Sequence, residues 1–146
     1  MAVQEIDIRT TTPATPEQVW RLLDDSSTWP SWTPIDFFVL IKPGNGDGPG
    51  EIREFVTGGY TIREEIVERR RDSRLSYVLL SGLPLRDYRA DIDLTPRAGG
   101  TDISWHTGFR SKVPGMGPLY RRGLAKITRR FVDGLAEHAA GAERAG

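Results

Sequence analysis

Residues 15 to 34 read TPEQVWRLLDDSSTWPSWTP, and their first half carries the signals of a helix N-terminus. Thr15 is suited to cap a helix, Pro16 to occupy its first position, and Gln18 to return a hydrogen bond to the cap. The apolar residues that follow share one helical face. We therefore predict a short helix over about residues 16 to 25.

The second half of this stretch, WPSWTP at 29 to 34, places two tryptophans three residues apart, each closely followed by a proline. Proline fixes the local backbone and removes a donor, so the segment forms at most a single helical turn or a tight corner. We predict a second, single-turn helix. So short an element cannot bury two indole rings by itself, and their partners must come from elsewhere in the chain.

Composition limits the class of protein. The 146 residues fit one domain with its own core, and the 20 basic and 20 acidic side chains give no overall field that would attract nucleic acid. The absence of cysteine excludes disulfides and thiolate chemistry. The longest apolar run, FFVLI at 37 to 41, is too short to span a bilayer, and the N-terminus lacks a signal-peptide core. A cytoplasmic protein is predicted.

From residue 35 to 110 the hydrophobic period is two, with turn residues between the runs. This pattern indicates an antiparallel meander, with strands near 35 to 42, 51 to 57, 60 to 70, 74 to 81, 86 to 95 and 101 to 110. After Gly117 and Pro118 a helical period returns and continues to about residue 139. Its predicted apolar stripe consists of Met116, Tyr120, Leu124, Ile127, Phe131, Leu135 and His138. Residues 141 to 146 are predicted to form a frayed tail.

The order of these elements, together with TPEQVWRLLDDSSTWPSWTP, RLSYVLLSGLP and GGTDISWHTGFR, resembles the SRPBCC (START-like, helix-grip) superfamily, and most closely its polyketide cyclase/dehydrase and lipid transport branch. The resemblance implies an α+β fold in one domain over residues 1 to 140. A curved antiparallel sheet of about seven strands would wrap around the long C-terminal helix, with two short helices after the first strand and an apolar cavity between sheet and helix. Gly123 and Gly134 on that helix fit either close packing or room for a ligand.

The resemblance also implies where a ligand would lie. The short helices of the family close one end of the grip, so Trp29 and Trp32 would pack there, with Trp32 the one that reaches the cavity mouth. Inward-facing tyrosines suit a cavity lining because a buried hydroxyl needs a partner. The residues predicted to contact a ligand are Trp32, Arg53, Phe55, Tyr77, Tyr88, Trp105, Phe109, Tyr120 and Leu124.

Two charged residues share the inward parity of neighbouring strands. Glu64 lies between Ile62 and Ile66, and Arg53 has the parity of Phe55. Buried charges have to pair, so one interpretation is an Arg53–Glu64 pair that binds a ligand oxygen. The other interpretation is two solvated strand residues.

Catalytic and cofactor motifs are missing from the sequence. The loop GNGDGPG at 44 to 50 lacks the ending of a P-loop, and neither GxSxG nor HExxH occurs. His106 and His138 lie far apart without a carboxylate cluster, so neither a metal nor a cofactor is expected. The basic run from Arg121 to Arg130 is interpreted as a solvated face. If it binds anything, an anionic lipid surface is the physical expectation.

Two functions remain open. In the first, the protein binds, and could transport, a small hydrophobic molecule such as a lipid or polyketide. In the second, it resembles an aromatase/cyclase acting on a bound poly-ketone, with Arg53, Glu64 and Tyr88 as catalytic candidates. The expected partner is a small hydrophobic molecule, with no nucleic acid and no stable membrane insertion, and the protein is expected to be a monomer or a homodimer.

Overall fold

A seven-stranded antiparallel sheet forms one layer of the protein, with the strand order β1-β7-β6-β5-β4-β3-β2. The computed structural model describes residues 2 to 145, and side chains for residues 2 to 141. The strands are β1 (Gln4–Thr12), β2 (Phe37–Lys42), β3 (Ile52–Thr57), β4 (Tyr60–Arg70), β5 (Arg74–Ser81), β6 (Leu85–Arg97) and β7 (Gly100–Ser111). The antiparallel meander and its strand positions are therefore confirmed: half of the predicted strand ends coincide with the observed ones, and the others differ by one or two residues.

The helices are α1 (Pro16–Asp24), a 3-10 turn η1 (Ser26–Thr28), α2 (Trp29–Trp32) and α3 (Gly117–Ala145). The predicted capping box is present: the Gln18 backbone N–H donates to Thr15 Oγ1 over 3.2 Å, and the Thr15 N–H donates to Gln18 Oε1 over 2.9 Å. Helix α3 continues through most of the segment predicted as a tail. The side chains of residues 142 to 146 lie outside the described ones.

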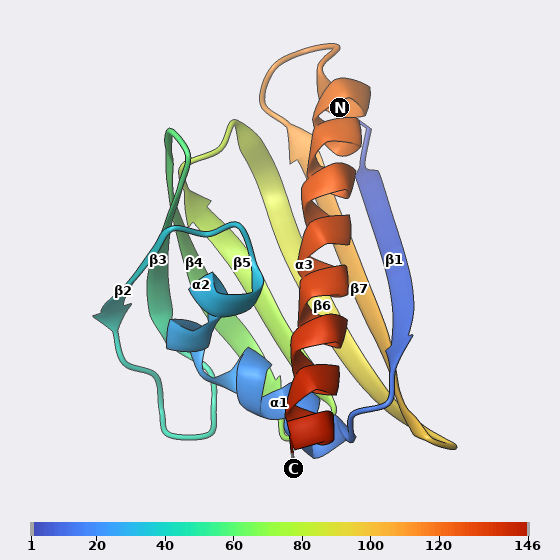
Figure 1. Ribbon diagram of the computed structural model, residues 1–146. Helices are drawn as coiled ribbons and strands as arrows, with labels where there is room; N and C mark the ends of the chain where they lie inside the picture. Colours follow the sequence, from blue (N-terminus) through green and yellow to red (C-terminus); the bar gives the residue numbers. More distant parts are fainter. Residues whose placement is uncertain (1, 146) are drawn as a thin grey trace.

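All three helices lie on the concave face of the sheet (Figure 1). Helix α3 packs on β1 and β7 at one edge, while α1 and α2 occupy the space between the C-terminal half of α3 and the other strands. Beside the N-terminal half of α3, by contrast, β4 and β5 have no helix in front of them (Figure 1). The helix-grip architecture is confirmed, and the helix covers the sheet unevenly.

The rotation of α3 differs from the predicted stripe. The residues that pack on the sheet are buried and, apart from one leucine, small or β-branched: Thr128, Val132, Leu135, Ala136 and Ala139. The Thr12 hydroxyl donates a hydrogen bond to the Ala136 carbonyl over 2.9 Å, and this bond holds β1 close to α3. Ile127 is 46% exposed and His138 is exposed, so assigning them to the packed face was wrong. The larger apolar side chains form a second stripe, about 100° around the helix from the first.

Aromatic packing explains how WPSWTP is held. Trp29 is fully buried, and its ring centroid lies 4.8 Å from that of Trp32, 5.4 Å from Phe55 and 5.7 Å from Trp105. Its indole Nε1–H donates to the Leu23 carbonyl over 3.2 Å. The core lies where α2 meets the middle of the sheet, and it is filled by the protein's own side chains at that level.

The two helical glycines have different environments. A Cβ on Gly134 would overlap the carbonyl oxygen of Trp32, whereas a Cβ on Gly123 would meet nothing within 4 Å. Close packing is therefore the reason for Gly134, because α2 touches α3 backbone to backbone at this residue. Gly123 is exposed.

Candidate functional site

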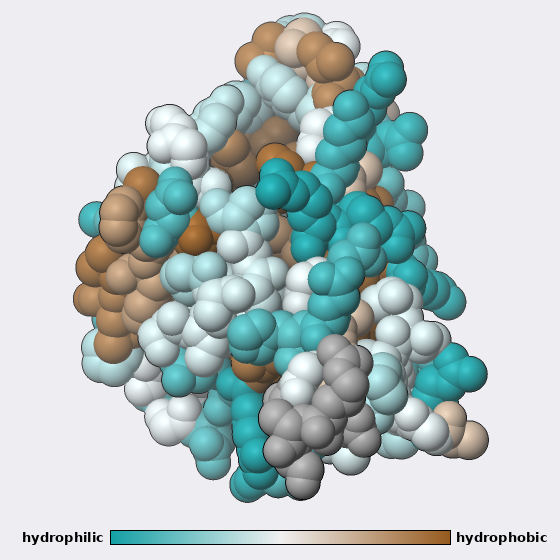
Figure 2. Space-filling view, in the orientation of Figure 1, coloured by the Kyte–Doolittle hydropathy of each residue, from teal (hydrophilic) through white to brown (hydrophobic). Residues whose placement is uncertain are grey.

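A hollow opens above α2, beside the N-terminal half of α3, and hydrophobic residues are visible within it (Figure 2). At this level several inward-facing apolar residues of the sheet and the helix are only half-buried. They are Ile62, Leu79, Leu83, Tyr88, Tyr120 and Leu124. The same kinds of side chain are fully buried lower down, where α2 and its tryptophans fill the space. The hollow is therefore the part of the concave face that no segment of the described chain covers.

The second apolar stripe of α3 follows the edge of this hollow. Near its C-terminal end the stripe is covered, because Phe131 packs on Trp29 and Trp105 and Gly134 meets α2. One and two turns earlier, Ile127 is 46% exposed and Leu124 is half-buried. The apolar stripe of α3 thus continues beyond the part that α2 covers.

Arg53 and Glu64 face each other across β3 and β4 on the concave face. Arg53 is 0% exposed and Glu64 is 8% exposed. The Nε–H of Arg53 donates to Glu64 Oε1 over 3.1 Å, and Nη2 lies 3.0 Å from the same oxygen. The structure brings Arg53 and Glu64 together as a buried pair, which was one of the two interpretations of the sequence. The other interpretation, two solvated strand residues, is wrong.

Aromatic rings surround the guanidinium of Arg53. Its Cζ lies 4.0 Å from the ring centroid of Trp29, 4.7 Å from that of Phe55 and 4.8 Å from that of Tyr77. A cation that has lost its water is stabilised by the faces of such rings. Arg53 is thus held by one carboxylate and three aromatic side chains.

Further polar groups connect this pair to the protein surface. Arg53 Nη1 donates to Ser26 Oγ over 3.0 Å, and the Ser26 hydroxyl donates to Glu51 Oε2 over 2.5 Å. Glu51 Oε1 accepts from Arg69 Nη2 over 3.1 Å, and Arg69 Nε lies 3.0 Å from Asp24. This row of groups fixes the geometry of the guanidinium from the side opposite Glu64.

The tyrosines next to the pair are kept neutral. Burial, followed by the neighbouring Tyr88 and Glu64, raises the pKa of Tyr77 well above its ordinary value. Burial, followed by Glu64, likewise raises the pKa of Tyr88. The two rings are neighbours, with centroids 6.4 Å apart. Both phenols therefore stay protonated over the physiological pH range and are able to donate a hydrogen bond.

The ionisation of Glu64 is expected to weaken the fold. Burial raises the pKa of Glu64, and the opposing effect of Arg53 only partly offsets it. A raised pKa in the folded state means that folding favours the protonated form of Glu64. The stability that protonated Glu64 contributes is therefore fully present below the unfolded pKa of about 4.3, and it is lost as the pH rises through the folded pKa.

We therefore expect the unfolding free energy of the wild type, relative to that of Glu64→Gln, to fall as the pH is raised from below 4 through the folded pKa of Glu64. Urea denaturation of both proteins across that range measures the difference. A wild type that instead gains stability relative to the variant would show that the pKa of Glu64 is depressed, and this assignment would be wrong.

The structure divides the predicted ligand-contact residues into two groups. Tyr88, Tyr120 and Leu124 border the hollow and are half-buried. The others are fully or almost fully buried in the core: Trp32, Arg53, Phe55, Tyr77, Trp105 and Phe109. Of these, Phe109 lies beside Tyr88, with ring centroids 6.4 Å apart.

Several residues of this region were missed from the sequence. Ile62, Leu79 and Leu83 border the hollow. The inward parity of Ile62 was used to place Glu64 but not to name Ile62 as a ligand contact, and the same parity finds Leu79, two positions from the inward-facing Tyr77. Ser26 was missed for another reason. Its contact with Arg53 depends on the turn η1, whose conformation leaves no periodic signal in the sequence.

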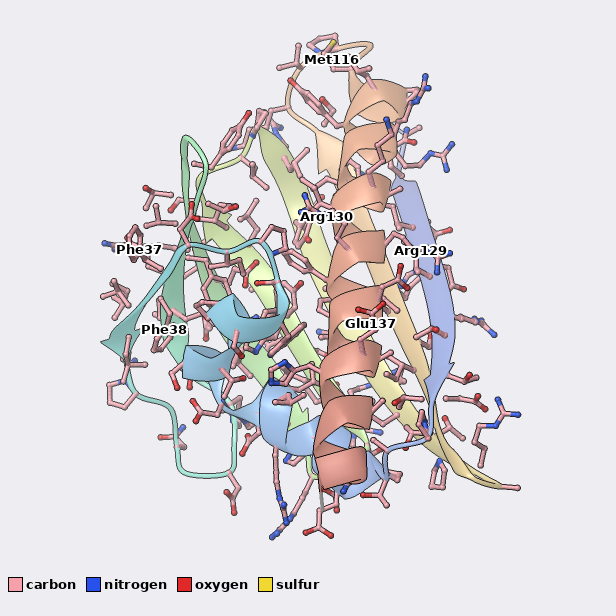
Figure 3. All side chains as sticks on the ribbon, viewed as in Figure 1. Phe37, Phe38, Met116, Arg129, Arg130 and Glu137 are labelled. Atoms are coloured by element: carbon pink, nitrogen blue, oxygen red, sulfur yellow. The ribbon has the colours of Figure 1, made fainter. Side chains whose placement is uncertain are left out.

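Two surface depressions lie outside the hollow. A polar crevice of about 500 Å³ separates the end of α2 from α3 and is lined by Trp32, Arg130, Gly134, Glu137 and His138, among others. Figure 3 shows Arg130 and Glu137 on this side of α3. A depression of about 250 Å³ lies on the convex face above Gly108. Trp32, predicted to reach a cavity mouth, is 5% exposed and borders the polar crevice.

Helices able to cross a bilayer are not found among the described residues. The cytoplasmic location stays a prediction.

The sequence matches the family model for polyketide cyclase/dehydrase and lipid transport proteins over residues 4 to 140. The chain belongs to this family. No curated protein matches it significantly. Solved structures of similar fold include a START superfamily protein from Mycobacterium smegmatis, with 12% identity, a TM-score of 0.82 and coverage of 94% of this chain and 98% of that one.

Two further structures with the same fold have somewhat higher identity. A protein from Thermobifida fusca is 22% identical, with a TM-score of 0.79 and coverage of 92% of both chains. The protein TTHA0849 from Thermus thermophilus is 19% identical, with a TM-score of 0.76 and coverage of 95% of this chain and 99% of that one. The TM-scores show that this family member shares its fold with these proteins.

Proposed function

We propose that the protein binds a small, largely apolar molecule in the hollow between α3 and strands β4 to β6. The observation that carries this proposal is the apolar stripe of α3, which is covered by α2 at Phe131 and uncovered at Leu124 and Ile127. When a ligand covers apolar surface in a concave site, the binding free energy becomes more favourable by roughly 25 cal/mol for each Å² removed from water. The family description, which names both polyketides and lipids, supports the same chemical class.

Polar groups below the hollow indicate what the inner end of the ligand carries. Arg53 Nη2 and Thr107 Oγ1 are buried without a well-directed hydrogen bond among the described residues. The phenols of Tyr77 and Tyr88 stay protonated. A ligand with a carbonyl or hydroxyl oxygen would offer a well-directed partner to Arg53 Nη2 and Thr107 Oγ1, whereas a pure hydrocarbon would not. The proposed ligand is therefore an apolar skeleton with an oxygen at its buried end.

Catalysis on such a ligand is the second candidate, and one observation favours it. Glu64, with its raised pKa, lies beside a buried guanidinium and two neutral phenols. A carboxyl group poised in this way is suited to move a proton, and Arg53 is suited to stabilise an enolate oxygen. Closure of a poly-ketone ring by aldol addition and dehydration requires both. Carriage without reaction requires only the hollow.

Filling the hollow tests the proposal. Leu124→Trp places an indole in the space next to Tyr120, and it is expected to reduce the affinity for the neutral apolar probe N-phenyl-1-naphthylamine at least tenfold, as measured by fluorescence titration. Leu80→Trp is the matched control, because Leu80 is 47% exposed and has the outward parity of its strand. Equal probe affinity in the two variants would refute the site, provided that both retain the wild-type thermal transition.

Native mass spectrometry of the protein purified from its own host then distinguishes the two functions. A copurified apolar molecule that is released unchanged supports carriage. A poly-ketone that is cyclised by the wild type and left linear by Glu64→Gln, with probe affinity retained, supports catalysis.

A further inference from the structure

One part of the surface combines basic charge with exposed apolar side chains. Residues 110 to 130 contain no acidic residue, although the whole chain has 20 basic and 20 acidic side chains. Their seven basic residues are Arg110, Lys112, Arg121, Arg122, Lys126, Arg129 and Arg130. The segment runs from the end of β7 through a loop into the first half of α3.

Few of these charges are neutralised within the protein. Arg110 lies 3.8 Å from Asp87, and Arg129 lies 3.8 Å from Asp133. Among the described residues, no carboxylate lies within 4.0 Å of Arg121, Arg122 or Lys126. The positive electrostatic field of this segment is therefore directed toward the solvent.

Apolar side chains project from the same end of the molecule. In the loop between β7 and α3, Val113 is 41% exposed, and Leu119 in the first turn of α3 is 59% exposed. Met116 lies at the tip of this loop (Figure 3). Leu80 and Tyr60, at the neighbouring ends of β5 and β4, are 47% and 59% exposed. Figure 2 shows hydrophobic surface at this tip, next to the hollow.

We propose that this end of the protein docks on an anionic lipid bilayer, with the loop between β7 and α3 in the interface and the opening of the hollow toward the membrane. Basic residues beside apolar tips are what an anionic interface binds, since the charges meet lipid headgroups while Val113, Met116 and Leu119 enter the boundary with the acyl chains. A nucleic acid would attract the same charges, yet it would leave these apolar side chains in water. The docking is peripheral.

The inference adds to the proposed function because it names the source of an apolar ligand. Docking is measured without any ligand, so the two proposals can fail separately. An open hollow next to the membrane would let an apolar molecule move between bilayer and protein with little exposure to water.

Sedimentation with sucrose-loaded vesicles tests the inference. Vesicles with about 30% phosphatidylglycerol in phosphatidylcholine are expected to bind the wild type, vesicles of phosphatidylcholine alone are not, and salt is expected to weaken the binding. Arg121→Gln with Arg122→Gln is expected to lower partitioning roughly 30-fold, because each basic residue at an anionic surface contributes about fivefold. Leu119→Ser is expected to weaken it further without any change of charge.

A variant with the same net charge is the control. Arg70→Gln with Arg71→Gln removes two charges at the turn between β4 and β5, which lies at the opposite end of the sheet. This variant should bind like the wild type. Equal losses in the two double variants, or no binding to anionic vesicles by the wild type, would overturn the proposal. So would tight binding of single-stranded RNA that Leu119→Ser leaves unchanged, because that result would assign the basic segment to nucleic acid.

Discussion

Replacing Arg53 by methionine is expected to lower the unfolding free energy by about 3 to 5 kcal/mol, the usual cost of removing one partner from a buried ion pair. The variant leaves Glu64 buried without its cation, and Ser26 loses the N–H donor of its hydrogen bond with Arg53. Methionine fills much of the same volume, so the loss reflects charge more than a cavity. Chemical denaturation at neutral pH measures it.

The double variant Arg53→Met with Glu64→Leu is the control for this prediction. Replacing both members of a buried pair by apolar residues is often neutral or stabilising, so most of the loss should be recovered. An Arg53→Met variant as stable as the wild type would show that the pair is open to water, and the account of the site would be wrong. A double variant that is stable and folded, yet binds the apolar probe differently, would separate the ligand role of the pair from its structural one.

Gly134→Ala is expected to be the most damaging single-methyl change on α3, with a loss of about 3 kcal/mol or more, because overpacking at a rigid contact forces the backbone to move. The added Cβ would overlap the Trp32 carbonyl oxygen, and this oxygen belongs to backbone that cannot rotate away. Relief requires α2 to shift, together with Trp29 and the rings packed on it. Thermal unfolding followed by tryptophan fluorescence reports the change directly.

Gly123→Ala on the same helix is the matched comparison. Its Cβ meets nothing within 4 Å, and alanine is favoured over glycine in a helix interior by about 1 kcal/mol, so this variant should be slightly more stable than the wild type. Similar effects of the two alanine substitutions would contradict the close contact between α2 and α3.

Local signals in the sequence predict most of the fold. The helix start at Thr15 follows from side-chain chemistry within four residues, and the strands follow from a period of two that the sheet imposes along its whole length. The Arg53–Glu64 contact follows for the same reason. Parity places both side chains on one face, and the tight turn at Gly58 and Gly59 sets them opposite each other.

The parts that could not be predicted depend on what an element packs against. Helix α3 has one face of small residues and one stripe of large ones, and hydrophobicity alone favours the large ones. In the structure the small face packs on β1, because Ala136 and Ala139 allow the backbones to approach, and the large stripe is shared between α2 and the hollow. The position of Ser26 against Arg53 likewise depends on a tertiary contact and has no local signature.

The central claim is that an apolar molecule enters the hollow between the N-terminal half of α3 and strands β4 to β6. Methyl-labelled NMR spectra of the protein with N-phenyl-1-naphthylamine test it most directly. Intermolecular NOEs from the probe to the methyl groups of Leu79, Leu83 and Leu124 are the predicted result. NOEs confined to Val39, Leu40 and Ile41, which are exposed on the edge strand β2, or no NOEs at saturating probe, would contradict it.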